Sequence, residues 1–269
     1  MLKGLNVHLS GPLGPVSAGI AAKQFKLIRF DVPSALSNLG ALHEESLRNG
    51  LKLLPIVENV EHILAIPAPL TATYCGVELF NEPNIGRRFT SAAYAARIAP
   101  MIEAALSQGL TPWVGCIYNL HPASQDWLAD VLRRLPTDMR IGVTIHRYPW
   151  GSTWEAPAKG FITREAETDA VKKIIGGRRF GLSEFGFTEE RLCNLQFSWN
   201  YPFIRRICQQ WSSYDVLTLI RQEFAWWQTN GAEFAVVYQL NNGPIGSDEQ
   251  YGIRTHPDGI WKPQADCCL

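Results

Sequence analysis

Short apolar segments alternate with longer amphipathic segments along almost the whole chain. Eight apolar segments have the length and composition of buried strands, and polar or turn-forming residues bound them. The eight predicted strands cover residues 5–9, 27–32, 51–57, 74–80, 113–118, 141–148, 179–185 and 234–240. Apolar residues recur at helical spacing in most of the segments between them. The seven predicted helices cover residues 16–23, 34–48, 60–66, 91–107, 124–135, 165–175 and 214–229.

This alternation predicts parallel strands joined by right-handed crossovers. Eight strand–helix units of about 34 residues match an α/β fold of the (β/α)8, or TIM, barrel type. The rival arrangement is an open doubly wound sheet, which usually carries a glycine-rich phosphate-binding loop. The sequence has no such loop, and only residues 241–269 follow the last predicted strand, so we expect a reduced eighth helix. Residues 1–269 are therefore predicted to form a single barrel domain, with 188–212 as its longest connection.

The charge balance argues against nucleic acid and against a membrane as partners. The chain has 25 Lys or Arg and 25 Asp or Glu without a basic run, and no apolar run approaches the roughly 18 residues of a membrane span. The chain enters its first predicted strand without a secretory signal, so we expect a cytoplasmic monomer unless it was trimmed from a secreted protein. The six cysteines lack CxxC spacing, which argues against a metal site. Cys116, within a predicted strand, is interpreted as a small buried thiol.

Two glutamates stand where predicted strands end. Glu82 follows the fourth strand and Glu184 lies at the end of the seventh, and a turn-forming Pro or Gly comes shortly after each. In a (β/α)8 barrel the carboxyl ends of all strands meet at one mouth, so both carboxyl groups are expected there. Two such groups suit chemistry at an acetal carbon, where one carboxylic acid protonates the leaving oxygen and one carboxylate attacks the anomeric carbon. Their environments must then differ, so that one pKa is raised and the other is kept low.

The residues around both glutamates resemble a known clan of enzymes. The segments 81–83 (Asn-Glu-Pro) and 184–186 (Glu-Phe-Gly) are similar to motifs of the retaining glycoside hydrolases with 4/7 barrels, most closely those of the cellulase-like family 5. The resemblance implies that Glu82 is the acid/base, that Glu184 is the nucleophile, and that Asn81 binds the sugar 2-hydroxyl. It also implies an enzyme that needs neither a metal nor an organic cofactor.

Further residues fit the same resemblance. The His-Arg-Tyr segment at 146–148 is similar to the clan's His-x-Tyr at the end of strand six, and alternation points His146 and Tyr148 to one face. The resemblance places such a tyrosine on the nucleophile and such a histidine near the acid/base. Arg29 resembles the clan's strand-two arginine, which would keep the nucleophile anionic. Glu78 is interpreted as a structural partner of Arg29 inside the barrel.

The pattern departs from family 5 at two strands. Strand three ends in Val-Glu-Asn at 57–59 where family members usually carry a His, and Tyr238 stands on strand eight where they usually carry a Trp that stacks on sugar. Tyr238 and Trp150 are candidate sugar contacts, because the apolar C–H faces of sugars pack on aromatic rings. Trp154 and Trp199 lie in other predicted mouth loops and are candidates of the same kind.

Together these features predict a retaining β-glycoside hydrolase acting on a neutral β-linked oligo- or polysaccharide, such as an endo-β-glucanase or a related glucan or mannan hydrolase. The alternatives are an exo-acting or uronic-acid-specific β-glycosidase of the same clan, with Arg87, Arg88 and Arg147 near the mouth, or a non-catalytic carbohydrate-binding barrel. A metal-dependent barrel enzyme would need a ligand cluster such as His-x-His on strand one. Strand one offers Asn6 and His8 instead, and the sequence suggests no neighbour that would give His8 a role.

Overall fold

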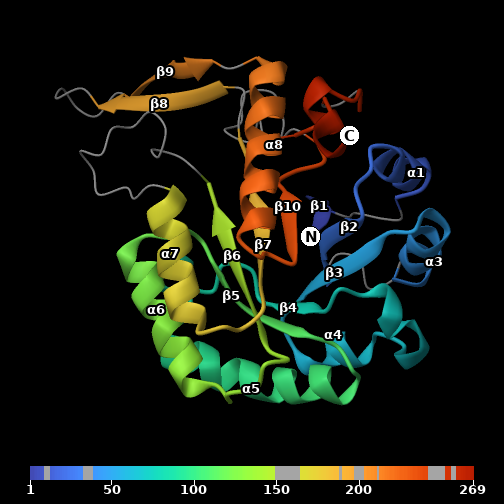
Figure 1. The fold of residues 1–269 in the computed structure, drawn as a ribbon, viewed down its shortest axis with the longest axis vertical. Helices are drawn as coiled ribbons and strands as arrows, with labels where there is room; N and C mark the ends of the chain where they lie inside the picture. Colours follow the sequence, from blue (N-terminus) through green and yellow to red (C-terminus); the bar gives the residue numbers. More distant parts are fainter. Residues whose placement is uncertain are drawn as a thin grey trace.

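Eight parallel strands close into a barrel in the computed structural model (Figure 1). The structure describes residues 1–8, 13–32, 39–148, 164–187, 190–196, 203–210, 212–241, 252–255 and 259–269. The barrel strands are β1 (Leu2–Asn6), β2 (Leu27–Asp31), β3 (Lys52–Val57), β4 (Val77–Leu79), β5 (Pro112–Ile117), β6 (Gly142–Arg147), β7 (Phe180–Phe185) and β10 (Phe234–Val237). Their order around the barrel is β1-β10-β7-β6-β5-β4-β3-β2, so β1 and β10 lie side by side. The predicted (β/α)8 fold class is confirmed.

Helices follow the strands in turn and surround the barrel (Figure 1). The α-helices are α1 (Pro15–Ala22), α3 (Leu39–Asn49), α4 (Val60–Leu64), α5 (Ser91–Ser107), α6 (Pro122–Arg134), α7 (Arg164–Ile175) and α8 (Ser213–Thr229). The short 3-10 helices are η2 (Ala68–Thr73), η3 (Ile85–Arg87) and η5 (Pro263–Cys268). In the described part of the chain after β10, the only helix is η5, which packs against α8. The expected reduction of the eighth helix is therefore confirmed.

A β-hairpin lies between β7 and α8, where the sequence pattern indicated only a long connection. Its strands β8 (Glu190–Gln196) and β9 (Phe203–Gln210) pair antiparallel and form a separate two-stranded sheet. Figure 1 shows this hairpin outside the barrel, beside the start of α8. The hairpin is an addition to the barrel and not one of its eight strands.

Aromatic rings fill the amino-terminal end of the barrel interior. Trp113 of β5 packs edge to face on Phe234 of β10, with ring centroids 4.8 Å apart. Both are fully buried and form one apolar cluster with Leu27, Leu54 and Val236. Small residues on neighbouring strands make room for them. A Cβ added to Gly181 would lie 2.6 Å from the Phe234 ring.

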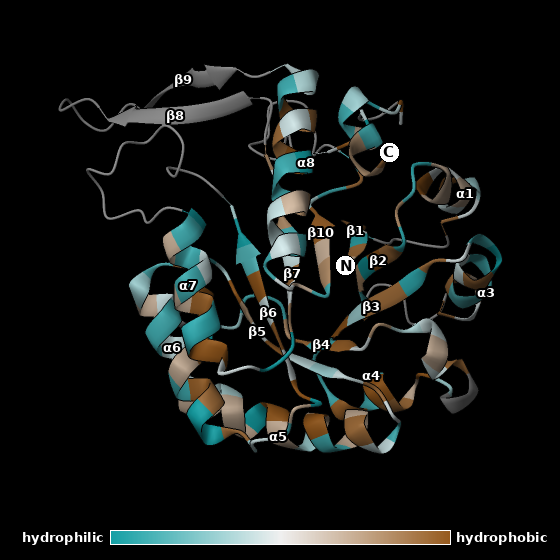
Figure 2. Cartoon of the chain, viewed as in Figure 1, coloured by the Kyte–Doolittle hydropathy of each residue, from teal (hydrophilic) through white to brown (hydrophobic). Residues whose placement is uncertain are grey.

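Toward the carboxyl ends of the strands the barrel interior becomes polar. Arg29, Glu78, Thr144, Ser183 and Glu184 are all buried there. Figure 2 shows that much of the strand surface is apolar, whereas the surrounding helices mix apolar and hydrophilic residues. A buried polar layer above an apolar floor is costly unless its groups pair with one another, which marks this end of the barrel as the candidate site.

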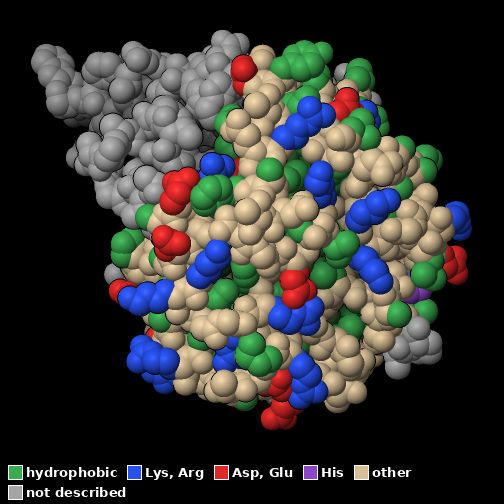
Figure 3. Space-filling view, viewed as in Figure 1, with side chains coloured by type: hydrophobic (Ala, Val, Ile, Leu, Met, Phe, Trp, Pro, Cys, Tyr) green, Lys and Arg blue, Asp and Glu red, His purple; other side chains and the backbone are tan. Residues whose placement is uncertain are grey.

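The outer surface carries charges of both signs. On the face in Figure 3, Lys and Arg side chains lie interspersed with those of Asp and Glu. Within the described ranges, no helix combines the length and the hydropathy that crossing a membrane requires.

Candidate active site

Glu82 and Glu184 come together at the carboxyl ends of the barrel strands. One carboxylate oxygen of each lies within 4.8 Å of the other, and a ring nitrogen of His146 lies within the same distance of both. The register of β6 and β7 pairs His146 directly with Glu184. Glu82 follows β4 with a φ of +47°, in the left-handed region that non-glycine residues seldom adopt. Backbone outliers of this kind cluster at functional sites.

Three neighbours hold Glu184 as a carboxylate. The Nη1 of Arg29 donates a hydrogen bond to its Oε1 at 2.5 Å, and the Tyr148 hydroxyl donates to its Oε2 at 2.6 Å. The Nδ1 of His146 lies 3.4 Å from the same Oε2. Burial opposes the charged form, but His146, Arg29 and the Tyr148 hydrogen bond outweigh it and lower the pKa of Glu184. Glu184 is therefore ionised at neutral pH, as a nucleophile must be.

Arg29 lies buried at the centre of a hydrogen-bond network. Its Nε donates to Glu78 Oε2 at 2.5 Å, its Nη1 donates to Asn6 Oδ1 at 2.9 Å as well as to Glu184, and its Nη2 donates to Asn81 Oδ1 at 2.7 Å. The expected pairing of Glu78 with Arg29 is confirmed. One guanidinium thus pairs with two buried carboxylates and supplies one positive charge to the pair. It also fixes the side chain of Asn81 next to the nucleophile candidate.

His146 connects Glu82 to Cys116, which the sequence did not indicate as a site residue. Its Nδ1 lies 2.9 Å from Glu82 Oε1, and its Nε2 lies 3.0 Å from the Sγ of Cys116. Burial opposes a charged ring, but Cys116, Glu184 and Glu82 outweigh it and hold the pKa of His146 above its ordinary value. Burial raises the pKa of the Cys116 thiol. Cys116 is buried as expected, but its sulfur faces the site.

The two glutamates have unequal surroundings. The side chain of Glu82 is 18% exposed, compared with 7% for Glu184. Arg29 and the Tyr148 hydroxyl face Glu184, whereas Glu82 Oε1 contacts His146 nearer to solvent. A carboxyl pair that divides the roles of acid and nucleophile needs this kind of inequality.

The rim on the side of β1, β2 and β10 adds a second group of polar and aromatic side chains. Tyr238 lies edge-on to Tyr148, with ring centroids 6.1 Å apart, and its ring also meets that of His8 at 5.7 Å. The Nδ1 of His8 lies 3.2 Å from Asp31 Oδ2, and this hydrogen bond raises the pKa of His8. The expectation that His8 has no supporting neighbours is therefore wrong. Asp31 lies 23 residues further along the chain, and only the pairing of β1 with β2 brings the two together.

Arg147 points away from the mouth. Its Nε pairs with Glu167 of α7 at 2.6 Å and its Nη1 pairs with Glu223 of α8 at 3.0 Å, and its side chain is 3% exposed. Arg147 is therefore buried and already paired with two carboxylates of the protein. Arg88 lies nearer the mouth, where its Nη2 pairs with Glu58 at 2.9 Å. The predicted sugar contact Trp150 lies outside the described residues, as do Trp154, Trp199 and the side chain of Arg87.

Two groups of side chains have the right atoms for a metal ion. One consists of Glu78, Cys116 and His146, and the other of Glu82, Glu184 and His146, each with its candidate ligand atoms within 4.8 Å of one another. The guanidinium of Arg29 contacts both Glu78 and Glu184, and His146, whose pKa is raised, lies 3.4 Å from Glu184 and adds a second positive charge. Charge compensation in the site is thus internal to the protein.

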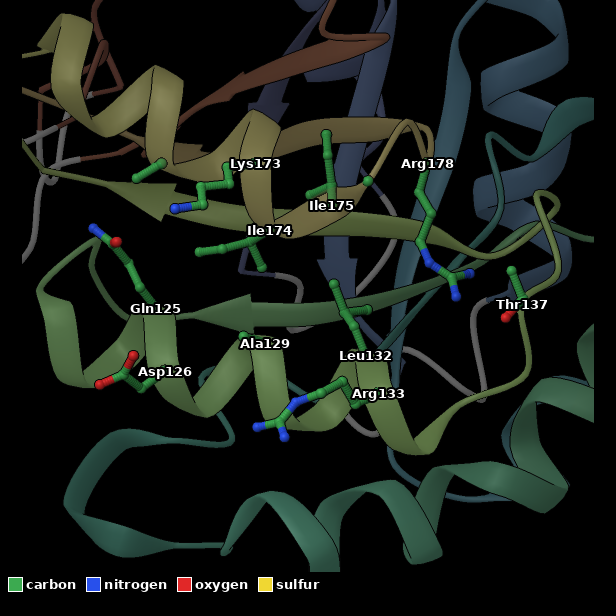
Figure 4. A pocket seen from close by; sticks show the side chains of 12 residues that line it. Gln125, Asp126, Ala129, Leu132, Arg133, Thr137, Lys173, Ile174, Ile175 and Arg178 are labelled. Atoms are coloured by element: carbon green, nitrogen blue, oxygen red, sulfur yellow. The ribbon is translucent and has the colours of Figure 1, made fainter.

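A groove with a volume of about 660 Å³ lies away from the mouth, between α6 and α7 (Figure 4). Its walls include Gln125, Leu132, Lys173 and Ile174, and Arg178 lies at one end. The Arg178 guanidinium donates to two backbone carbonyl oxygens of the same region. The groove is on the outer helical layer and does not contain the paired carboxylates.

Comparison with known proteins finds solved structures of the same fold. No protein-family model matches the chain, and no curated protein sequence matches it. A family 17 β-1,3-glucanosyltransferase from Rhizomucor miehei superposes with a TM-score of 0.65 at 11% identity, over 97% of this chain and 96% of that one. An endoglucanase from Pseudomonas stutzeri gives 0.58 at 14% identity, over 99% and 92%. An exo-β-1,3-glucanase from Aureobasidium namibiae gives 0.58 at 14% identity, over 98% and 95%. At these identities the likeness shows the barrel fold alone.

Proposed function

We propose that this protein is a retaining β-glycoside hydrolase. The observation that carries the proposal is the pair Glu82 and Glu184, with carboxylate oxygens within 4.8 Å of each other and with unequal partners. Retaining glycosidases hold their two carboxyl groups about 5–5.5 Å apart, whereas inverting enzymes leave about 6.5–9.5 Å for a water molecule. The close approach supports the double-displacement mechanism. That solved structures with this fold include several glycoside hydrolases supports the same reaction class.

In the first step Glu184 attacks the anomeric carbon and the glycosidic C–O bond breaks. Glu82 gives its proton to the departing oxygen, so that a covalent glycosyl–enzyme ester and a free alcohol form. In the second step Glu82, now a carboxylate, removes a proton from water, and the resulting hydroxide displaces Glu184 from the anomeric carbon. The proton taken from water stays on Glu82, which is thereby restored as the acid, and the sugar leaves with its original stereochemistry. In this proposal Asn81, which accepts a hydrogen bond from Arg29, hydrogen-bonds the sugar 2-hydroxyl beside the nucleophile.

The proposed substrate is a neutral β-linked glucan or a related mannan. Of the three arginines considered for a uronic acid, Arg88 and Arg147 already pair with carboxylates of the protein, and the side chain of Arg87 lies outside the described residues. The pair Tyr148 and Tyr238 offers aromatic surface at the mouth, on which a sugar ring packs. The proposal extends to endo action on an oligo- or polysaccharide, with the protein acting as a monomer.

The test is a panel of 4-nitrophenyl β-glycosides and β-glucan and β-mannan polysaccharides, assayed with Glu184→Gln and Glu82→Gln variants. We expect Glu184→Gln to lose activity on the order of 10³-fold or more. We expect Glu82→Gln to lose about 10²–10⁴-fold on substrates whose leaving group needs protonation. The matched control is Glu103→Gln, which changes an exposed glutamate of α5. Unchanged activity in Glu184→Gln, or an α-configured first product by NMR, would refute the proposal.

A further inference from the structure

The strand that carries Cys116 is distorted next to the site. In β5 the pairing with β6 shifts register between Gly115 and Ile117, so Cys116 is an extra residue without a partner in the ladder. Gly115 has a φ of +99° and Cys116 a φ of +41°. A non-glycine residue seldom adopts such a φ, and β-bulges of this kind re-aim side chains beside active sites.

The bulge exchanges the directions of two neighbouring residues. Trp113 faces the barrel interior, so regular alternation would also turn residue 115 inward and residue 116 outward. In the structure a Cβ added to Gly115 would lie 2.9 Å from Leu128 of α6, outside the barrel. The Cys116 thiol instead lies inside, fully buried, with its Sγ 3.0 Å from the Nε2 of His146. The bulge therefore places the Sγ of Cys116 next to the Nε2 of His146.

The sulfur is the nearest partner of the His146 Nε2, at 3.0 Å, and the Nη2 of Arg29 lies farther away, at 3.5 Å. If the ring is neutral and the thiol donates its hydrogen to Nε2, the ring proton sits on Nδ1. If the ring is charged, both nitrogens carry protons, and Nε2–H donates to the sulfur. In either of these states the Nδ1–H lies 2.9 Å from Glu82 Oε1 and 3.4 Å from Glu184 Oε2, so Glu82 Oε1 is its nearer acceptor.

We propose that Cys116 is a positioning residue for the acid/base Glu82, acting through the imidazole of His146. By keeping Nδ1–H on Oε1, it leaves the transferable proton of Glu82 on Oε2, from which it passes to the leaving oxygen. This inference rests on the proposed glycosidase function. Cys116 itself forms no bond to the sugar and transfers no proton to it.

The test compares Cys116→Ala with Cys116→Ser on two aryl β-glycosides. A 2,4-dinitrophenyl glycoside loses its leaving group without acid assistance, whereas a phenyl glycoside needs the proton of Glu82. In Cys116→Ala the ring can protonate Nε2 and turn an Nδ1 lone pair to Glu82, which then donates its own proton to the histidine. We expect kcat/KM for the phenyl glycoside to fall about 10-fold more than that for the dinitrophenyl glycoside. Cys116→Ser keeps a donor at this position and should restore most of the difference.

A matched control is Cys75→Ala, which removes a thiol outside the site and should leave the ratio of the two rates unchanged. Equal losses on both substrates in Cys116→Ala, or a serine variant as impaired as the alanine variant, would overturn the proposal. A second measurement is independent of activity. Nitrogen-15 NMR of the His146 ring, recorded at a pH above the pKa of the ring so that the ring is neutral, should show Nδ1–H in the parent protein and in Cys116→Ser, and Nε2–H in Cys116→Ala.

The NMR result separates this inference from the proposed function. A parent protein without activity on any glycoside would contradict the glycosidase proposal, while the tautomer would still report on the coupling of Cys116 to His146. An unchanged tautomer in Cys116→Ala would overturn the inference even in an active enzyme.

Discussion

Replacing Tyr148 with Phe removes one hydroxyl from Glu184 and leaves the aromatic ring in place. In the structure this hydroxyl donates to Glu184 Oε2 at 2.6 Å, and the carboxylate is almost fully buried. A hydrogen bond to a charged group contributes about 1.5–3 kcal/mol. Because one pKa unit corresponds to about 1.36 kcal/mol, the loss should raise the pKa of Glu184 by roughly 1–2 units.

The sign follows from which form the hydroxyl stabilises. A donor favours the carboxylate and depresses its pKa, so its removal makes the nucleophile protonate at higher pH. The acidic limb of the plot of kcat/KM against pH reports the ionisation of this group in the free enzyme. We expect that limb to move upward by roughly 1–2 pH units in Tyr148→Phe. Arg29 and His146 remain beside the carboxylate and limit the shift.

The assay is kcat/KM for a 4-nitrophenyl β-glycoside between pH 3 and 9, with the product measured after quenching in alkali. Tyr214→Phe is the control, because Tyr214 is a tyrosine of α8 that is 69% exposed. An acidic limb that stays in place in Tyr148→Phe, or that moves to lower pH, would show that the Tyr148 hydroxyl does not set the ionisation of Glu184.

Two further predictions concern the stability of the barrel. Arg147→Met leaves the buried Glu223 without one of its counter-ions. We expect the free energy of unfolding to fall by about 3 kcal/mol and the melting temperature to fall by roughly 6–12 °C. An unchanged melting temperature would show that this ion pair does not stabilise the barrel. Gly181→Ala places a Cβ 2.6 Å from the buried Phe234 ring, and we expect the free energy of unfolding in urea to fall by about 1–3 kcal/mol, whereas Gly40→Ala, in open space on α3, should not destabilise the protein.

The positions of the two glutamates could be predicted from the sequence because barrel topology is simple. Once eight strands are counted, every strand end lies at the same mouth, so Glu82 and Glu184 must approach each other whatever their separation in the chain. Alternation along a strand likewise places His146 and Tyr148 on one face. These inferences need only the number of strands and the fact that side chains alternate between the two faces of a strand.

Features that interrupt the regular alternation of side chains along a strand, or of strands and helices along the chain, could not be predicted in the same way. The sequence indicates Cys116 only as a small buried thiol within a strand, and the bulge at Gly115 turns its side chain into the barrel interior. The hairpin of β8 and β9 was missed because it lies outside the strand–helix alternation. His8 and Asp31 come from two different strands and meet at the rim of the barrel. The sequence around each residue alone does not indicate this contact.

The pairing of β1 with β10 closes the barrel and limits how early the protein can fold during its synthesis. Leu2 pairs with Phe234, more than 230 residues later in the chain. At a synthesis rate of roughly 5–20 residues per second, the first strand waits about 10–45 s for its neighbour to emerge. The bond from Arg29 to Glu184 spans the barrel interior from β2, which neighbours β1, to β7, which neighbours β10. A nascent chain that stops short of β10 therefore leaves β1 and β7 with unpaired edges, and the two sides of the barrel that carry Arg29 and Glu184 are not yet joined between them.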